Sequence, residues 1–298
     1  IEDGNIGVFG SSGYGKSLTV TTILLSLAAE YSPEQLHYYI FDFGNGALLP
    51  LRQLPHTADY FNLDEERKIW KFVRMMKEEI NHRKQLFQQM EVSNIKMYNG
   101  LSDEPLPLIF ITVDNFDLAK EEIEDLEMQF TQFVRDGQSL GIYMILTATR
   151  VNAVRQALMN NFKTKIVHYL MDQTEAQQII GRLPYALEAI PGRAIIKKDQ
   201  AFFAQMFLPA EGEDDFTVFE RMKQEIQEIG QKYHEAQQPK PIPMLPSKLT
   251  ITDMDSNPEV KQEEGMIPLG LDEESVQPVY INFRKSKHCL IFGQSQKG

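Results

Sequence analysis

Cysteine is nearly absent from this chain of 298 residues, in which Cys289 is the single one. One cysteine excludes an internal disulfide framework and a CxxC metal site, and it is typical of a protein from a reducing compartment. Long apolar runs are missing as well. The runs are only a few residues long, far below the ~20 that a membrane-spanning helix needs. We therefore expect no part of this chain to cross a bilayer.

Basic residues are in the minority. The chain has 30 Lys and Arg against 42 Asp and Glu, which gives a net charge of -12 and a pI near 5.1. Such a chain has no basic field for nucleic acid or anionic lipid, so a DNA motor is disfavoured, although not excluded. The six histidines show no H-x-x-x-H or H-E-x-x-H spacing, so each is more simply a surface or core residue than a metal ligand.

Short apolar runs alternate with segments of helical periodicity along most of the chain. The predicted strands are residues 5–9, 37–43, 106–113, 141–147 and 165–170. The predicted helices begin near Lys16, cover residues 64–90, run from an N-cap at Asp117 to about Asp136, and run from Asp214 toward Gln238. Residues 194–196 and 202–207 predict an antiparallel hairpin with its turn at 198–200. The alternation predicts an α/β fold with a mostly parallel central sheet, helices on both faces and an antiparallel edge hairpin.

A glycine-rich turn between the first strand and the first helix carries the main chemical signal. It matches G-x-x-x-x-G-K-[ST] at every position: Gly10, Ser11, Ser12, Gly13, Tyr14, Gly15, Lys16 and Ser17, followed by Leu18. The glycines let backbone N–H groups turn toward phosphates, and the positive end of the helix points at the same place. We expect Lys16 to reach the β- and γ-phosphates of ATP and Ser17 to hold Mg²⁺.

A second part of such a site is an acidic residue at the end of a neighbouring apolar strand. Asp114 follows the predicted third strand, and we expect it to order the hydration shell of Mg²⁺. Enzymes of this kind that hydrolyse ATP usually place Glu next, to polarise water, but this chain has Asn115. Loss of general-base help costs ~10²- to 10⁴-fold in rate. Asp117 is an alternative base, although its role as a helix cap is the simpler interpretation.

Two other patterns carry less weight. The triplet Asp42-Phe43-Gly44 spells the metal-binding DFG of protein kinases, but no H-R-D loop accompanies it, so we interpret it as a coincidence. Lys197-Lys198 and residues 284–287 are short basic clusters, which we interpret as solvated turns.

The end of the chain repeats its beginning. Phe-Gly, a serine two residues later and a glycine three after that occur at 9–15 and again at 292–298, where the last residue is Gly298. Four prolines between 239 and 246 predict an extended linker. We therefore expect an ATPase module at 1–238 that lacks its first strands, a Pro-rich and polar linker at 239–265, and the opening strands and truncated P-loop of a following module at 266–298. Strand-like pieces in that last part are 279–283 and 289–292.

Taken together, these segments resemble the FtsK/SpoIIIE-type RecA-like ATPases, and within them the EccC/EssC ATPases of type VII protein secretion. The resemblance covers essentially the whole chain. It is carried by the P-loop and by four further stretches: residues 39–44 with Leu54-Pro55-His56, residues 113–116 with 124–127, residues 141–150, and Pro191-Gly192-Arg193-Ala194. It implies a RecA-like P-loop NTPase fold.

The resemblance also implies an assembly. Members of the group are large membrane-anchored proteins with three ATPase modules in tandem, which form hexamers and recruit small helical-hairpin substrates of the WXG100 type. It implies that the chain lies on the cytoplasmic side of the bacterial cell membrane, is attached only through segments outside it, and contacts the adjacent modules. The acidic net charge and Asn115, by contrast, lead us to expect no nucleic acid as a partner. Because the first module usually keeps the catalytic Glu, Asn115 favours the second module.

Two further residues come from the resemblance. In FtsK-type motors a helix with an E-x-x-R-R pattern provides an arginine finger to the next subunit, and Glu79 to Arg83 matches it with His82 in place of one Arg. Arg83 is therefore a candidate finger, with an ion pair inside its own domain as the alternative. Thr149 stands at the sensor position, where DNA translocases usually have Gln or Asn.

Four functions remain open at this point. The first is a module that binds Mg-ATP, hydrolyses it slowly or not at all, and couples occupancy to assembly or export. The others are a fully active ATP-hydrolysing motor that uses Asp117 or a residue of the next protomer, a DNA translocase, and a docking platform with a vestigial P-loop. The intact Lys16, Ser17 and Asp114 speak against the last of these.

Overall fold

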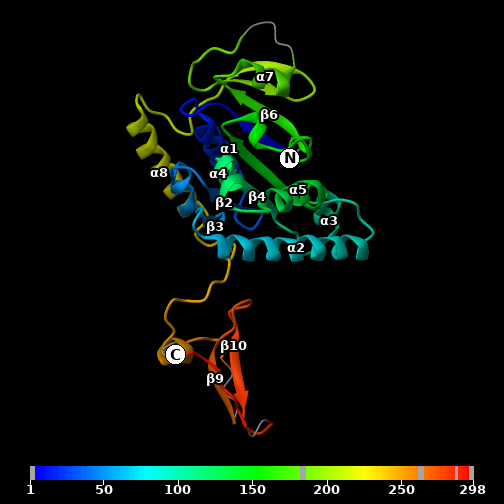
Figure 1. The fold of residues 1–298 in the computed structure, drawn as a ribbon, viewed down its shortest axis with the longest axis vertical. Helices are drawn as coiled ribbons and strands as arrows, with labels where there is room; N and C mark the ends of the chain where they lie inside the picture. Colours follow the sequence, from blue (N-terminus) through cyan, green and yellow to red (C-terminus); the bar gives the residue numbers. More distant parts are fainter. Residues whose placement is uncertain (1–3, 182–185, 261–264, 286–287, 295–298) are drawn as a thin grey trace. The chain divides into compact units, whose positions relative to one another are not determined.

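The computed structural model describes residues 4–181, 186–260, 265–285 and 288–294 (Figure 1). Its contacts group the chain into two compact units, Ile1–Pro241 and Ile242–Gly298. Each unit has a sheet of its own, with eight strands in the first and two in the second among the described residues. The division falls at Pro241, inside the proline-rich segment.

Strands and helices alternate through the first unit. Its strands are β1 (Asn5–Phe9), β2 (Leu36–Asp42), β3 (Thr57–Phe61), β4 (Leu108–Asp114), β5 (Ile142–Ala148), β6 (Phe162–His168), β7 (Arg193–Lys197) and β8 (Ala201–Gln205). Its helices are α1 (Lys16–Glu30), α2 (Glu66–Gln89), α3 (Ile95–Leu101), α4 (Phe116–Glu122), α5 (Leu126–Gly137), α6 (Gln156–Met159), α7 (Gln173–Ile180) and α8 (Asp215–Lys232). Short 3₁₀ turns lie at Leu49–Gln53, Gln138–Leu140 and Val151–Ala153.

The sheet has the strand order β3-β2-β4-β5-β1-β6-β7-β8. Its first six strands are parallel, and β7 and β8 add to β6 as an antiparallel hairpin at one edge. The predicted mostly parallel sheet with an antiparallel edge hairpin is confirmed. Every residue of β4 except the first is buried, as a strand covered on both faces requires.

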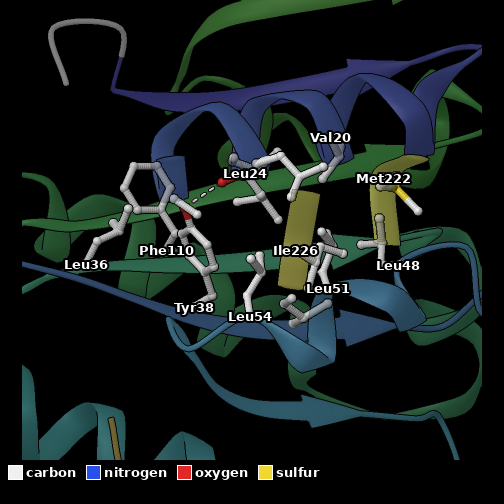
Figure 2. Packing of buried hydrophobic residues seen from close by; sticks show 14 of the residues in the cluster. Val20, Leu24, Leu36, Tyr38, Leu48, Leu51, Leu54, Phe110, Met222 and Ile226 are labelled. Atoms are coloured by element: carbon white, nitrogen blue, oxygen red, sulfur yellow. Dashed lines mark hydrogen bonds between the residues drawn. The ribbon is translucent and has the colours of Figure 1, made fainter. Parts of the chain in front are cut away.

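Helices α1 and α8 cover one face of this sheet. Val20 and Leu24 of α1 and Met222 and Ile226 of α8 share a buried cluster with strand residues such as Tyr38 (Figure 2). The hydroxyl of Tyr38 is buried in this cluster and donates to the carbonyl oxygen of Leu24 at 2.8 Å, so its polar group is satisfied there.

Aromatic rings fill the opposite face. Phe41 of β2 stacks on Phe61 of β3 with ring centroids 4.2 Å apart, and it meets Phe72 of α2 and Phe130 of α5 edge to face at 4.9 and 5.6 Å. The Phe41 ring is fully buried. Since neighbouring residues of a strand point to opposite faces, β2 supplies both cores, and helices cover both faces as predicted.

The helix predicted from Asp117 to Asp136 is wrong in two respects. It is two helices, because the backbone leaves the helical conformation at Ile123 and turns left-handed at Asp125, with φ 64°. Asn115 rather than Asp117 occupies the N-cap position, also left-handed at φ 59°. Asp117 lies inside the first turn, where its carboxylate binds backbone groups of another loop.

Several short helices and strands were not predicted from the sequence. These are β3, α3, α6 and α7, each of eight residues or fewer. Helix α8 also ends earlier than expected, at Lys232. In the described part of the chain, no helix is both long and apolar enough to span a membrane.

The second unit contains a short helix, α9 (Ile251–Asp255), and a hairpin of β9 (Met266–Leu271) with β10 (Pro278–Asn282). β10 matches the strand predicted at 279–283, whereas β9 and α9 were not predicted. The strand predicted at Cys289–Phe292 is wrong for this structure, because that segment is irregular and no strand among the described residues pairs with it. Most of the truncated P-loop pattern, residues 295–298, lies outside the described residues.

The packing of Phe41 on the aromatic face predicts a large loss of stability when its ring is removed. Phe41→Ala should lower the free energy of unfolding by about 3–5 kcal/mol, because it removes a buried ring that contacts β3, α2 and α5. Chemical denaturation of the purified chain measures this. Phe216→Ala, which truncates a ring that is 71% exposed, is the control and should change the value by less than about 0.5 kcal/mol. Equal effects of the two changes would contradict the assigned core.

Candidate nucleotide-binding site

The glycine-rich turn lies between β1 and α1, as the motif requires. β1 ends at Phe9 and α1 begins at Lys16, after Gly15 in a left-handed conformation at φ 102°. An L side chain rarely adopts that conformation. Gly10 is needed for a different reason, because a Cβ atom there would lie 2.7 Å from Cβ of His168. These two glycines shape the turn and let it pass close to β6.

Backbone hydrogen bonds fix the turn against two other segments. The N–H of Ser11 donates to the carbonyl of Tyr169 at 2.8 Å, and the N–H of Met171 donates to Oγ of Ser11 at 3.1 Å. On the other side, the N–H of Gly192 donates to the carbonyl of Tyr14 at 3.1 Å. The turn is therefore held by the segment that follows β6 and by the residue that precedes β7.

Lys16 lies at the start of α1 with its ammonium group directed back at the turn. Its Nζ donates to the carbonyl oxygen of Ser11 at 3.3 Å. Burial lowers the pKa of Lys16 below its ordinary value, while the charges of Asp114 and Asp117 act in the opposite direction. A desolvated ammonium held by these carboxylates is suited to bind phosphate oxygens. Leu18, the residue after Ser17, is 42% exposed and does not line the cavity.

Asp114 is the centre of the polar contacts at the end of β4. The hydroxyl of Ser17 donates to its two carboxylate oxygens at 3.2 and 3.0 Å, and the hydroxyl of Thr147 donates to Oδ1 at 2.7 Å. Burial raises the pKa of the Asp114 carboxyl above its ordinary value, opposed by the bond from Thr147. Thr147 also accepts a hydrogen bond from the N–H of Asn115 at 2.9 Å.

Asn115 and Thr149 face each other across the end of the sheet. Oγ1 of Thr149 donates to Oδ1 of Asn115 at 3.4 Å. The carboxylate of Asp117 lies behind them and accepts from the backbone N–H of Thr149 at 2.6 Å and of Arg150 at 3.2 Å. Asp117 is thus occupied in holding the loop that carries Thr149, and its side chain is almost fully buried.

These groups line a cavity with a volume near 430 Å³. The described residues around it are Ser12, Gly13, Lys16, Ser17, Gly44, Asn45, Asp114, Asn115, Leu118, Thr147 and Thr149. The structure therefore brings together the predicted phosphate-binding, magnesium-binding and sensor positions in one place.

Some lining residues were not predicted from the sequence. Thr147, Gly44 and Asn45 follow or end the strands on either side of β4. Asp42 lies opposite Asp114 in the strand register, and its carboxylate accepts from the N–H groups of Gly44 and Leu48 and from the hydroxyl of Tyr60. The DFG triplet therefore shapes a loop of the cavity. The rule that carboxyl ends of parallel strands meet at one edge is the signal that could have found these residues.

The residues present fit Mg-ATP. The cavity is of the size that small-ligand sites have. Ser17 and Asp114 place a hydroxyl and a carboxylate oxygen together, which are the hard oxygen ligands that Mg²⁺ prefers. Bound Mg²⁺ would neutralise phosphate charge there, while Lys16 and the backbone N–H groups of the turn hold and orient the phosphates.

His168 supports the turn from behind. This fully buried residue ends β6, and its Nε2 lies 3.0 Å from Oγ1 of Thr19 on α1. Burial lowers the pKa of His168 to about 4, so the ring is neutral at pH 7. A neutral ring next to Lys16 adds no charge repulsion to the phosphate-binding end of α1.

Arg83 lies away from this cavity and inside its own domain. The side chain is 1% exposed. Its Nε donates to Oε1 of Glu79 at 2.6 Å, and its NH1 group donates to the carbonyl of Leu140 at 2.8 Å. In this conformation Arg83 does not reach a neighbouring subunit. It forms an ion pair with Glu79 of its own domain, as in the alternative interpretation.

Arg83→Ala should therefore act on stability. We expect a loss of about 1–3 kcal/mol in the free energy of unfolding, because the carbonyl of Leu140 is left buried without its donor, and an unchanged affinity for ATP. Denaturation and calorimetric titration measure the two effects. Lys84→Ala, whose side chain is 50% exposed on the same helix, is the control. An Arg83→Ala variant with normal stability and lost ATP turnover would restore the arginine-finger role.

Comparison with known proteins agrees with this geometry. Residues 2–194 match the model of the FtsK/SpoIIIE family. The chain is 58% identical over its whole length to the ESX secretion system protein EccC of Geobacillus thermodenitrificans, of which it covers 20%. It thus spans about a fifth of the length of the curated relatives it matches.

Solved structures show the same similarity. A structure of EssC ATPases 2 and 3 from Geobacillus thermodenitrificans matches all of this chain and 57% of that chain, with a TM-score of 0.97 at 58% identity. A structure of Thermomonospora curvata EccC, ATPases 2 and 3, in complex with a signal sequence peptide matches 94% of this chain and 51% of that one, with a TM-score of 0.73 at 25% identity. The fold is that of the P-loop ATPases, and the chain belongs to the FtsK/SpoIIIE family.

Proposed function

We propose that this chain is an ATP-binding module of a type VII protein secretion ATPase. It binds Mg-ATP, hydrolyses it slowly or not at all, and couples nucleotide occupancy to assembly or export. In this proposal Gly10 to Ser17 hold the phosphates, Ser17 and Asp114 hold Mg²⁺, and Thr149 senses the terminal phosphate. The similarity to EssC ATPases 2 and 3, together with Asn115, supports its place as the second module of the tandem array.

The observation that carries the proposal is the lining of the cavity. Among the described residues around it, Asp114 is the one carboxylate, and its oxygens already accept from Ser17 and Thr147. The position next to it offers the amide of Asn115, which cannot take a proton from water as a carboxylate does. The groups that bind nucleotide are complete, whereas the group that activates water is missing.

A fully active motor would need another base. Asp117 is the nearest candidate in sequence, but its two oxygens accept the backbone N–H groups of Thr149 and Arg150. Both oxygens are therefore engaged by backbone donors, and Asp117 is not among the described residues that line the cavity. A residue from a neighbouring protomer is the remaining source for a motor. A DNA translocase is less favoured, since the net charge of -12 opposes nucleic acid.

The partners follow from the relatives. The EccC structure with a signal sequence peptide supports a peptide-bearing secreted protein as the cargo of the assembly, which we propose to be of the WXG100 type. Adjacent ATPase modules of the same chain and further copies in a hexamer are the proposed neighbours. The module acts at the cytoplasmic side of the membrane, to which other parts of the protein attach it. Occupancy shifts such an assembly only through different affinities for its states.

Nucleotide binding is the first test. Isothermal titration with ATP and Mg²⁺ should give a dissociation constant well below millimolar. Lys16→Ala should weaken it by about 10- to 100-fold, because a charged hydrogen bond to phosphate is lost. Binding no tighter than millimolar in the intact chain would overturn the proposal and favour a docking platform with a vestigial P-loop.

Hydrolysis is tested by restoring the carboxylate. Asn115→Glu should raise the rate of phosphate release from a low value by at least about 10²-fold, because it supplies the missing general base. The control is Asn115→Gln. Its side chain has the length of Glu but no carboxylate, so it should leave the rate unchanged. Rapid turnover by the original chain that is lost in Asp117→Asn, with no gain in Asn115→Glu, would establish the motor instead.

A further inference from the structure

Three lysines lie on adjacent backbone positions at the edge hairpin. Lys163 and Lys165 belong to β6, and Lys197 ends β7. We refer to these three residues as the lysine surface. It lies outside the nucleotide cavity, none of whose described lining residues it contains. In the sequence, Lys197 and Lys198 indicate only a solvated turn, whereas the sheet register places the two lysines of β6 beside Lys197.

The register places two of these charges directly opposite each other. Lys165 and Lys197 are partners in the antiparallel ladder of β6 and β7. Their side chains therefore leave the same face with Cβ atoms ~4.5–5.5 Å apart, a position where like charges destabilise a sheet. On its other side Lys165 lies beside Gly7 of β1, which has no side chain. Neither neighbour in the ladder compensates the charge.

Among the described residues, no carboxylate forms an ion pair with Lys165 or Lys197 either. Nζ of Lys165 donates to the carbonyl of Phe162 at 2.6 Å, and Nζ of Lys197 donates to the carbonyl of Asp199 at 3.4 Å. Across the described ranges of the chain, the ion pairs include none with Lys163, Lys165 or Lys197. Burial lowers the pKa of Lys165, and the charge of Lys197 lowers it further.

Several other lysines of this acidic chain are paired with carboxylates. Lys68, Lys84 and Lys223 each have a carboxylate oxygen within 3.3 Å. A repulsive pair that is kept without a counter-charge breaks a local rule of sheet design, and natural proteins do so mainly where function requires it. Within the described residues, the pair of Lys165 and Lys197 therefore lacks a negative counter-charge.

We propose that the lysine surface binds an acidic segment of a partner polypeptide. A segment with a few carboxylates matches the short spacing of Lys165 and Lys197 and would convert their repulsion into two ion pairs. A polypeptide is favoured over a nucleic acid because a duplex would extend its phosphates into the field of a chain with net charge -12. This inference does not depend on nucleotide binding, so the ATP titration and the experiment below can fail separately.

Fluorescence anisotropy with a labelled poly-glutamate peptide tests it on the intact chain. We expect saturable binding that weakens as salt is raised. The variant Lys165→Glu/Lys197→Glu should bind at least about tenfold more weakly, because two charge-assisted contacts become repulsive. The control is Lys84→Glu/Lys96→Glu, which makes the same change in net charge on α2 and α3 and should bind as the original chain does.

A second measurement shows that the fold survives and tests the repulsion itself. Lys165→Glu alone should raise Tm by about 1–3 °C, because the cross-strand pair becomes attractive. Equal poly-glutamate binding by the original chain and the Lys165→Glu/Lys197→Glu variant would overturn the proposal. So would tighter binding of a labelled DNA duplex than of the peptide, if that binding is lost in the same variant.

Discussion

The buried carboxylate of Asp114 holds the nucleotide end of this module together. It is 3% exposed and accepts hydrogen bonds from Ser17 of α1 and Thr147 of β5, while its own main-chain oxygen accepts from the N–H of Phe43 after β2. A buried ionised group is tolerated only when it is hydrogen-bonded or paired. The side-chain donors come from α1 and β5, and the main-chain bond adds the loop after β2, so the bonds of this one residue fix the relative positions of these three segments. The same bonds that make the carboxylate tolerable also build the cavity.

In the proposed function, binding and hydrolysis separate at the residue after Asp114. Asn115 has φ 59°, and asparagine adopts this left-handed conformation more readily than most residues because its short side chain bonds locally. Here its amide oxygen accepts from Thr149, and its backbone N–H donates to Thr147. Thr149 in turn depends on Asp117 for the position of its backbone. Asn115, Thr149 and Asp117 therefore bind one another. These bonds order the end of the cavity but supply no general base for water.

The sequence was informative where a pattern has one physical explanation. The P-loop spacing, the apolar strand before Asp114 and the edge hairpin were predictable, because each follows from phosphate geometry or from burial on both faces. β3 and α3 were not, because β3 has no continuous apolar run and the seven residues of α3 are too few to show a helical period. Arg83 shows another limit. A motif specifies that an arginine is present, but whether it is exposed depends on Leu140, 57 positions away in the chain. The role of Asp42 required knowing that β2 pairs with β4.

The strands β6 and β7 connect the two charged regions of the module. At one end of β6, His168 bonds Thr19 of α1, and Gly192 just before β7 bonds Tyr14 of the P-loop. Further along the same two strands, Lys165 and Lys197 form the centre of the lysine surface. A paired strand is stiff along its length, so it transmits a displacement but does not create two states by itself. Coupling between the regions therefore requires nucleotide to favour one arrangement of the Tyr14 to Gly192 contact over another. That contact is a single backbone hydrogen bond between two loops, so it can rearrange without breaking the sheet.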